Sequence, residues 1–286
     1  MAAKIIDGKS ISKKVKEEIK SEVQKLREKG VVPKLTVILV GDDPASQVYV
    51  RNKEKSASQV GIISETIRLP ESTKESELLE LVKRLNDDPE VDGILVQLPL
   101  PEHISKDSVI ETISPDKDAD GFHPYNLGRL LAGIPSVIPC TPNGIMRMID
   151  EIGFELKGKN AVVVGRSVIV GKPVAQLLLA RHATVTICHS RTKNLEFYTK
   201  NADVLVVAVG KPEIISGSHI KDGAVVIDVG INRRDDGKLV GDVHFESAKE
   251  VASWITPVPG GVGPMTVAML LYNTVYLAKL HHGIDS

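Results

Sequence analysis

The chain has 286 residues, of which 42% are hydrophobic, and its formal net charge at pH 7 is -1. This length suggests about two domains with packed cores, and the charge balance gives no reason to expect a nucleic-acid or membrane partner. The two cysteines form no C-x-x-C pair, and no signal peptide or membrane-spanning apolar run is present, so we expect a cytoplasmic protein without disulfides.

Strand-like and helix-like runs alternate along the first half of the chain. Continuous Val, Ile and Leu runs separated by helices are typical of a parallel sheet that is covered on both faces. The predicted strands cover residues 34–41, 62–69 and 91–101, and the predicted helices cover residues 45–61 and 73–86.

The same alternation restarts in the second half. A joint between two domains is predicted within residues 136–154, where Thr141 resembles a helix N-cap and Pro142 a first helical residue. We expect an α/β protein of two domains around a cleft, in which residues 1–141 and 266–286 form the first domain and residues 142–265 a Rossmann-like second domain. The predicted strands of the second domain cover residues 160–165, 183–188, 202–210 and 223–232, and a last helix is predicted at 267–280.

The loop after the strand at 160–165 resembles part of a dinucleotide-binding fingerprint. Gly165 stands at the turn, Gly171 permits close packing, and Pro173 suits the first position of a helix. The usual G-x-G-x-x-G spacing is absent, so the loop alone is equally compatible with an ordinary strand-to-helix turn.

The end of the following strand indicates which dinucleotide is bound. An NAD-binding fold places an acidic residue there, whereas this chain has the stretch 189–192, His-Ser-Arg-Thr, with no acid. Ser190 and Arg191 would attract the 2′-phosphate of NADP, and Arg166 could add a second positive charge. The sequence therefore favours NADP over NAD, with a solvated loop arginine as the alternative for Arg191.

A lysine is expected near the ligand-binding edge of the first domain. Asp43 and Pro44 suit a helix start, and Tyr49 and Lys53 lie four residues apart on one face of that helix. Gln97 follows a predicted strand, so it is expected at the same edge as the lysine, where open α/β sheets bind ligands. The alternative is that Lys53 is an ordinary surface residue.

The acidic loop at 114–124 contains Asp116, Asp118 and Asp120. Their alternate spacing resembles part of a calcium loop, but the required downstream glutamate is replaced by Leu127, so no metal is expected. Cys140 has no neighbouring base in sequence and is expected to be a small core residue.

Several motifs together resemble the bifunctional methylenetetrahydrofolate dehydrogenase/methenyltetrahydrofolate cyclohydrolase family over residues 1 to about 280. They are "YVRNK", "GILVQLPLP", "PDKDADGFHPYNLGRL", "PCTPNG", "VVGRSVIVGKP", "HSRT", "GDV" and "ITPVPGGVGPMT". One departure is Ala119, where the family more often has valine.

The resemblance implies a homodimer in one-carbon metabolism that oxidises 5,10-methylenetetrahydrofolate with NADP and hydrolyses the product to 10-formyltetrahydrofolate. It implies catalytic roles for Lys53, Tyr49, Gln97 and Asp120. Folate would contact Tyr49, Gln97, Leu98, Asp120, Pro259, Gly260 and Gly261, and NADP would contact Gly165, Arg166, Ser167, Ile169, Ser190, Arg191, Val209, Gly210 and Ile231.

These roles suit the residue types. The Asp120 carboxylate can accept both the N3–H and the 2-amino group of a pterin, and Tyr49 offers a ring for stacking. Lys53 would move the proton of the hydrolytic step, and the glycines and prolines of 257–263 would form a rigid backbone wall. Without the resemblance, the best hypotheses are an NADP oxidoreductase of the amino-acid or shikimate dehydrogenase type, and a non-catalytic nucleotide sensor.

Overall fold

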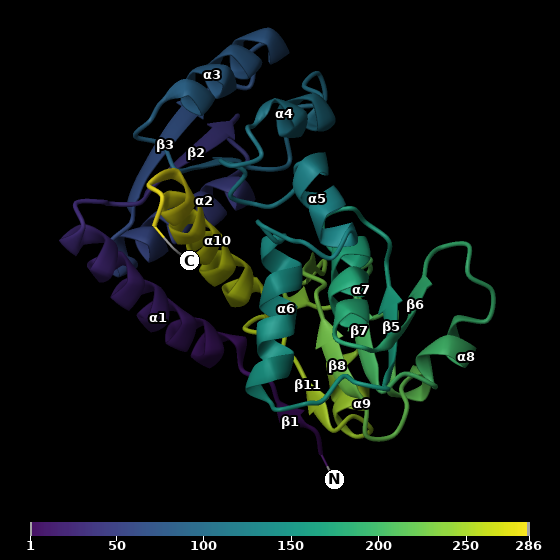
Figure 1. Cartoon of the computed structure of the whole chain (residues 1–286). Coiled ribbons are helices and arrows are strands. Elements are labelled where there is room, and N and C mark those ends of the chain that lie inside the picture. The colour runs from purple at the N-terminus through teal and green to yellow at the C-terminus, as the bar shows by residue number, and fades with distance from the viewer. Residues whose placement is uncertain (1, 285–286) are drawn as a thin grey trace. The chain divides into compact units, whose positions relative to one another are not determined.

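The computed structural model describes residues 2–284, which divide into two compact units (Figure 1). The three-stranded unit comprises Lys14–Cys140 and the residues from Val267 onward. The six-stranded unit comprises Thr141–Thr266 and the residues up to Lys13. The sequence-based boundaries counted the residues up to Lys13 with the first domain, but β1 (Lys4–Ile5) pairs with β11 (Trp254–Ile255) in the other unit.

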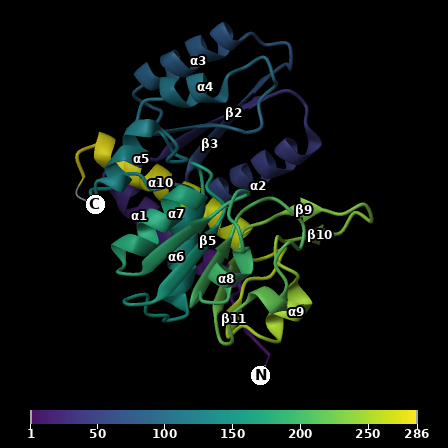
Figure 2. The same ribbon diagram turned by 90° about the vertical axis from the view of Figure 1, so that its right-hand side faces the viewer.

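The three-stranded unit contains a parallel sheet of order β3-β2-β4. Helix α3 (Glu75–Asp87) and α4 (Lys106–Thr112) pack on one face of the sheet, and α2 (Pro44–Val60) lies on the other (Figure 2). Buried apolar side chains at strand positions such as Ile38 and Ile94 meet Leu78 and Val82 of α3. The strands are β2 (Lys34–Val40), β3 (Ile63–Leu69) and β4 (Gly93–Val96), which confirms the strands and helices expected from the sequence, although β4 stops at Val96.

The six-stranded unit is built on a parallel sheet of order β1-β11-β8-β7-β5-β6. Its central strands are fully buried, as continuous valine runs in a doubly covered parallel sheet require. One face packs against the short helices α8 (Leu195–Thr199) and α9 (Phe245–Lys249), while α6 (Cys140–Glu151) and α7 (Gly171–Ala180) lie on the other (Figures 1 and 2). The central strands are β5 (Asn160–Val164), β6 (Thr184–Cys188), β7 (Val204–Val207) and β8 (Val225–Asp228).

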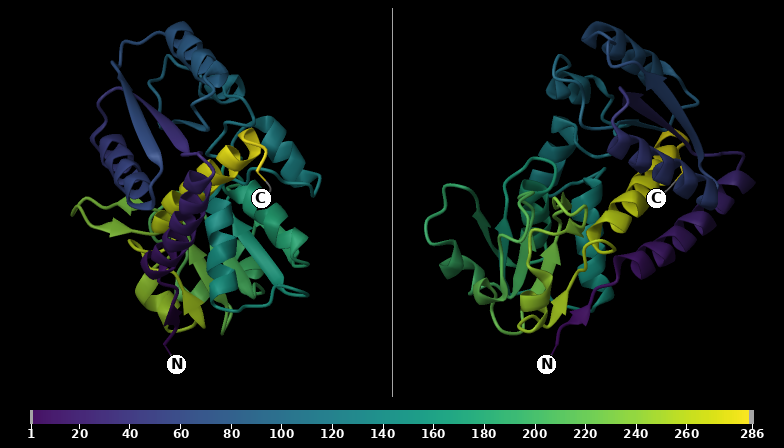
Figure 3. Two further views of the ribbon diagram at one scale, coloured as in Figure 1. Left: turned by 60° about the vertical axis from the view of Figure 1, so that its left-hand side comes forward. Right: turned by 180° about the vertical axis from the view of Figure 1, so that it is seen from behind.

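Several elements were not expected from the sequence. Helix α1 (Gly8–Glu28) has its apolar residues at three- and four-residue spacing, with Val15, Ile19 and Val23 buried. It lies alongside α10 (Val262–His281), where Lys279 Nζ is 2.7 Å from Glu22 Oε2 (Figure 3). Other unexpected elements are α4, α5 (Pro124–Leu131), the 3₁₀ turn η1 (Gly217–His219), the short strands β1 and β11, and the hairpin of β9 (Asn232–Arg233) and β10 (Leu239–Val240). None of the described helices is long and apolar enough to cross a membrane.

The helix starts test three further expectations. At α2 the prediction is confirmed, because the Asp43 carboxylate accepts a hydrogen bond from Ser46 N at 2.7 Å and Pro44 is the first helical residue. Helix α6 begins at Cys140, so the prediction of Thr141 as its N-cap and Pro142 as its first residue is wrong. Pro173 is the third residue of α7, and its predicted first position is also wrong, because α7 begins at Gly171.

Candidate functional site

The Lys53 side chain is half-buried and held by a single neutral partner. Its Nζ donates to Gln97 Oε1 at 2.9 Å. Gln97 lies directly after β4, and its own Nε2 donates to Leu98 O at 2.6 Å while its backbone N donates to Ile38 O. The hydrogen bond to Leu98 O orients the Gln97 amide, and the Oε1 atom of that amide determines where the lysine amine points. Lys53 and Gln97 are thus together at the carboxyl edge of the sheet, as expected.

Asp120 interacts electrostatically with this lysine. Residues 117–119 run beside β4, with Ile94 N donating to Lys117 O and Ala119 N donating to Ile94 O. Burial raises the pKa of Asp120 to about 6, the Lys53 ammonium opposes that rise, and the Asp118 carboxylate adds to it. At neutral pH Asp120 is therefore mainly ionised and can accept hydrogen bonds from a bound ring.

The loop that presents Asp120 is held by the neighbouring Asp118. Its buried carboxylate accepts hydrogen bonds from Gly121 N at 3.0 Å, His123 N at 2.8 Å and Asn126 Nδ2 at 3.0 Å. From α10, Asn273 Nδ2 donates to Ala119 O at 3.0 Å on the other side of the segment. Neither asparagine was predicted from the sequence. Asn126 bonds within the folded loop, to Asp118 and Pro115 O, and the partner of Asn273 is a backbone carbonyl far away in the chain.

Two other residues of this unit differ in exposure. Tyr49 is 43% exposed one turn before Lys53 on α2, so its ring is accessible for stacking. Cys140 is buried as expected, and burial raises the pKa of its thiol well above the usual value. Its Sγ donates to Ala119 O at 3.4 Å, which makes Cys140 a packing residue. In the described part of the chain, no group of three or more His, Cys, Asp or Glu side chains could hold a metal ion.

Replacing Asp120 by asparagine is expected to stabilise the protein at neutral pH. The folded pKa of about 6 exceeds the unfolded value of about 4, so folded chains hold more protons across that window and the free energy of unfolding falls as pH rises through it. Removing the carboxylate abolishes this fall, worth about 1–3 kcal/mol at pH ~7. Thermal unfolding at pH ~4 and ~7 measures the effect; the same pH dependence in both proteins would contradict it.

The six-stranded unit forms a tight backbone cradle after β5. Gly165 has a φ of +125°, and a Cβ there would lie 2.2 Å from Ala208 O. A Cβ on Gly171 would lie 2.2 Å from Gly165 O, so α7 starts directly against the strand end. Only glycine fits either position. The close approach of the α7 start to the end of β5 is the geometry expected of a dinucleotide-binding loop.

Ser167 closes the loop that precedes α7. The Ser167 Oγ accepts hydrogen bonds from Val170 N and Gly171 N, both at 3.2 Å, and Ser167 O accepts one from Lys172 N. The backbone N–H groups of Val170, Gly171 and Lys172 are therefore satisfied within the loop and helix. Arg166 and Ser167 themselves remain exposed, and Ile169 is half-buried.

Arg166 and Arg191 stand at adjacent strand ends. Strands β5 and β6 pair in parallel, with Val164 opposite Cys188, so the loops after them leave the same edge. A turn at 189–192 is closed by His189 N donating to Thr192 Oγ1 at 2.8 Å. Ser190 and Arg191 are exposed on this turn, which is the position that reads the ribose of a dinucleotide.

The remaining predicted cofactor and wall residues follow β7, β8 and β11 at the same edge. Val209 and Gly210 come after β7, and Ile231, which is 49% exposed, comes after β8. The wall residues Pro259, Gly260 and Gly261 come after β11. They are braced from the N-terminal segment, because Lys9 N donates to Gly260 O and a Cβ on Gly8 would lie 1.8 Å from Gly261 O.

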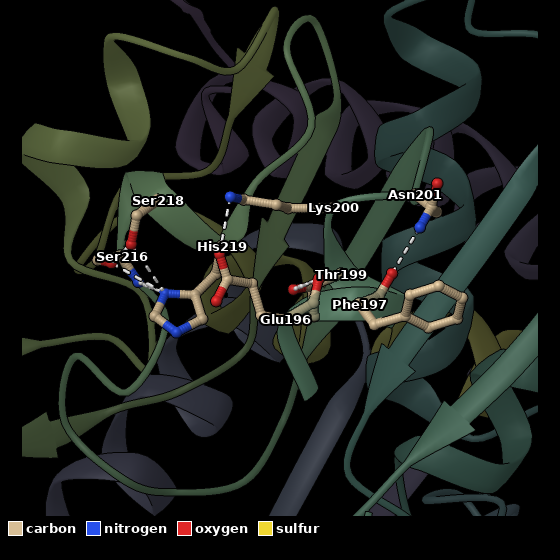
Figure 4. Close-up of polar contacts among 8 residues, drawn as sticks. All are labelled: Glu196, Phe197, Thr199, Lys200, Asn201, Ser216, Ser218 and His219. Carbon is tan, nitrogen blue, oxygen red and sulfur yellow. Dashed lines mark hydrogen bonds and ion pairs between the residues drawn. The ribbon is translucent and has the colours of Figure 1, made fainter. Parts of the chain in front are cut away.

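A separate polar cluster lies between α8 and η1 (Figure 4). Lys200 Nζ pairs with Glu196 Oε1 at 2.7 Å, and His219 Nδ1 lies 2.9 Å from Ser216 Oγ. Asn201 Nδ2 donates to Phe197 O. Each of these contacts joins residues three or four apart in sequence, so the cluster stabilises two short turns and contributes no converging group to the cofactor edge.

Sequence comparisons agree with this geometry. The model of the tetrahydrofolate dehydrogenase/cyclohydrolase catalytic domain matches residues 6–120, and that of the NAD(P)-binding domain of the same family matches residues 139–282. The chain is 61% identical over 279 residues to the bifunctional protein FolD of Moorella thermoacetica, covering 98% of this chain and 100% of that protein.

Solved structures extend the similarity to three dimensions. The bifunctional FolD methylenetetrahydrofolate dehydrogenase/cyclohydrolase of Campylobacter jejuni matches with a TM-score of 0.96 and 51% identity, covering 98% of this chain and 99% of that chain. The Trypanosoma brucei dehydrogenase-cyclohydrolase, solved with NADP and an inhibitor, matches with a TM-score of 0.93 and 41% identity, covering 98% of each chain.

Proposed function

Because the chain belongs to the tetrahydrofolate dehydrogenase/cyclohydrolase family, we propose that it catalyses two successive reactions of one-carbon metabolism. The first oxidises 5,10-methylenetetrahydrofolate to 5,10-methenyltetrahydrofolate with NADP. The second hydrolyses that cation to 10-formyltetrahydrofolate. The observation that most strongly supports this proposal is the hydrogen bond from Lys53 Nζ to Gln97 Oε1, beside Asp120 at the ligand-binding edge of a parallel sheet.

In this proposal the three-stranded unit binds the folate. Asp120 accepts hydrogen bonds from the N3–H and 2-amino groups of the pterin, in the paired geometry of a carboxylate facing two parallel donors. Tyr49 stacks on the folate rings. Leu98 and Gln97 border the same site, since Gln97 Nε2 donates to Leu98 O. Pro259, Gly260 and Gly261 belong to the six-stranded unit and offer backbone groups but no side chain suited to acid-base chemistry.

Lys53 is the group that moves a proton in the hydrolytic step. A water must lose a proton as it adds to the methenyl carbon, and a ring nitrogen must gain one as the bond to that carbon breaks. Gln97 occupies one of the three donors of the lysine amine and leaves the others for substrate and water. Because Gln97 is neutral, it orients the amine without forming an ion pair with it.

The dehydrogenase step depends mainly on position. When bound, NADP supplies the hydride acceptor, and the lone pair of a folate nitrogen helps to expel the hydride. Arg166, Ser190 and Arg191 bind the 2′-phosphate. The glycine cradle and the strand ends hold the rest of the dinucleotide through Gly165, Ser167, Ile169, Val209, Gly210 and Ile231.

We further propose that the protein is a cytoplasmic homodimer that associates through the six-stranded unit. Strand β6 is an edge strand of its sheet, with one side unpaired. Exposed apolar side chains occur on β6 and on the two helices that contact it, α7 and α8: Leu179 is 54% exposed, Ile187 37% and Phe197 61%. Such a patch on a nucleotide-binding unit supports association of two copies there.

The proposed function is tested by supplying methylenetetrahydrofolate with NADP, and with NAD in parallel, and following absorbance of the reduced nicotinamide. Hydrolysis of methenyltetrahydrofolate is followed separately, without nicotinamide. We expect both activities in one polypeptide. Absence of reduction with either nicotinamide would overturn the dehydrogenase, and a stable methenyl cation in the presence of the protein would overturn the cyclohydrolase.

A further inference from the structure

The six-stranded unit contains two buried aspartates that the proposed reactions leave without a role. Asp228 is the last residue of β8, and Asp242 belongs to the "GDV" stretch, Gly241–Val243. Asp228 is 3% exposed and Asp242 is fully buried. Buried carboxylates are costly unless several donors satisfy them, so their partners indicate what they stabilise.

Asp242 accepts four hydrogen bonds from two separate loops. Its Oδ2 accepts from Val209 N at 2.7 Å and from Gly210 N at 3.0 Å, while its Oδ1 accepts from Lys211 N at 2.9 Å. The fourth donor is Asn232 Nδ2 at 2.9 Å, directly after Ile231. One side chain therefore fixes the loops that follow β7 and β8.

Asp228 fixes Asp242 and the start of the second loop. Its Oδ1 accepts from Gly230 N and from Asp242 N, and its Oδ2 accepts from Val243 N, all at 2.9 Å. The two carboxylates pack so closely against the backbone that no side chain fits at the neighbouring glycines. A Cβ on Gly230 would lie 2.2 Å from Asp242 Oδ1, and a Cβ on Gly241 would lie 1.8 Å from Asp228 Oδ2.

The fixed loops are the ones that present cofactor-binding residues. Val209 and Gly210 donate directly to Asp242, and Ile231 lies between two residues that are held by the pair of carboxylates. Both loops leave the carboxyl ends of parallel strands, where a dinucleotide lies in this fold. Burial raises the pKa of Asp228 to about 7, which is consistent with a costly arrangement retained at a binding edge.

Resting on the proposed function, we propose that Asp242 is a positioning residue for NADP. It holds the loops after β7 and β8 in the conformation that receives the dinucleotide, so that binding does not have to order them. It does not touch the reacting atoms, and the hydrolytic step in the three-stranded unit does not depend on it.

The test is Asp242→Asn, which preserves size but replaces one accepting oxygen with an NH2 group facing backbone donors. Because each partner of Asp242 is a donor, at least one hydrogen bond is lost and a repulsive contact replaces it. NADPH binding, followed by its fluorescence, is expected to weaken about tenfold or more, with a matching rise in KM for NADP. Hydrolysis of methenyltetrahydrofolate without nicotinamide is expected to be unchanged.

A matched control is Asp203→Asn in the same unit. Asp203 also accepts a backbone hydrogen bond, from Asn160 N at 2.8 Å, and pairs with Lys221, but it precedes β7 at the opposite edge of the sheet. Its replacement is expected to leave NADPH affinity unchanged. Equal NADPH affinity in wild type and Asp242→Asn, or an equal loss in Asp203→Asn, would overturn the positioning role.

A milder variant keeps the proposal testable if Asp242→Asn does not fold. Asn232→Ala removes only the side-chain donor to Asp242 and is expected to weaken NADPH binding several-fold; unchanged affinity would then overturn the proposal. A wild-type protein that binds NADPH but does not oxidise methylenetetrahydrofolate contradicts the proposed function, while the binding comparison among the variants still decides the role of Asp242.

Discussion

Lys53→Met is expected to abolish the hydrolysis of methenyltetrahydrofolate while leaving measurable dehydrogenase activity. Methionine matches the length of the lysine stem but cannot transfer a proton. Loss of a positioned acid-base group typically lowers a rate about 10²- to 10⁴-fold. The oxidation step retains its substrate and cofactor contacts, because it relies on proximity. Parallel assays of the two activities on the same preparation measure the separation.

Lys55→Met provides the matched control for this result. Lys55 lies two residues further along α2 and its side chain is exposed, so it shares the helix and the charge but not the bond to Gln97. Both activities should survive that change. Full hydrolysis of the methenyl cation by Lys53→Met would remove Lys53 from the mechanism, and equal loss of both activities would assign it to folate binding instead.

The double variant Arg166→Ala/Arg191→Ala is expected to raise KM for NADP by about tenfold to a hundredfold while changing KM for NAD little. The two guanidinium groups stand at adjacent strand ends, where only NADP offers a 2′-phosphate. A charge-assisted hydrogen bond contributes about 1.5–3 kcal/mol, so losing one weakens binding about tenfold or more. Initial rates over a range of each nicotinamide measure the ratio.

Arg181→Ala is the appropriate comparison for that variant. Arg181 follows the last residue of α7 and pairs with Asp150, away from the carboxyl edge of the sheet. Its removal should affect neither nicotinamide, because a half-exposed ion pair contributes little. If the double variant impaired NADP and NAD equally, Arg166 and Arg191 would not be reading the 2′-phosphate.

The parts of the fold with strong local signals could be predicted from the sequence. Valine-rich runs gave the central strands, and Asp43 with Pro44 gave the start of α2, because these signals act within a few residues. Strands β1 and β11 are two residues long and exist only because residues 4–5 and 254–255 meet, so no local pattern predicts them. The start of α6 was missed because the Cys140 N–H is bound by Asp120 O.

Some residues of the candidate site could be predicted from the sequence and others could not. Lys53 and Gln97 could be predicted together because each follows a parallel strand, and the ends of such strands share an edge. Asp228 and Asp242 could not be predicted, because their partners, apart from the Asn232 side chain, are backbone N–H groups, which every residue type except proline has. The sequence feature that corresponds to this arrangement is glycine at 230 and 241, because the two carboxylates occupy the space that a side chain would fill at those positions.

The pairing of β1 with β11 affects the order in which a ribosome can finish this protein. The residues up to Lys13 emerge first, but their strand partner is made roughly 250 residues later. The three-stranded unit similarly waits for α10, whose Asn273 bonds to Ala119 O and Ile138 O. The six-stranded unit cannot complete its sheet until β11 has been synthesised, and the three-stranded unit cannot complete its hydrogen bonds until α10 has been synthesised. Nascent chains stalled before β11 would therefore leave both cores incomplete and open to chaperones.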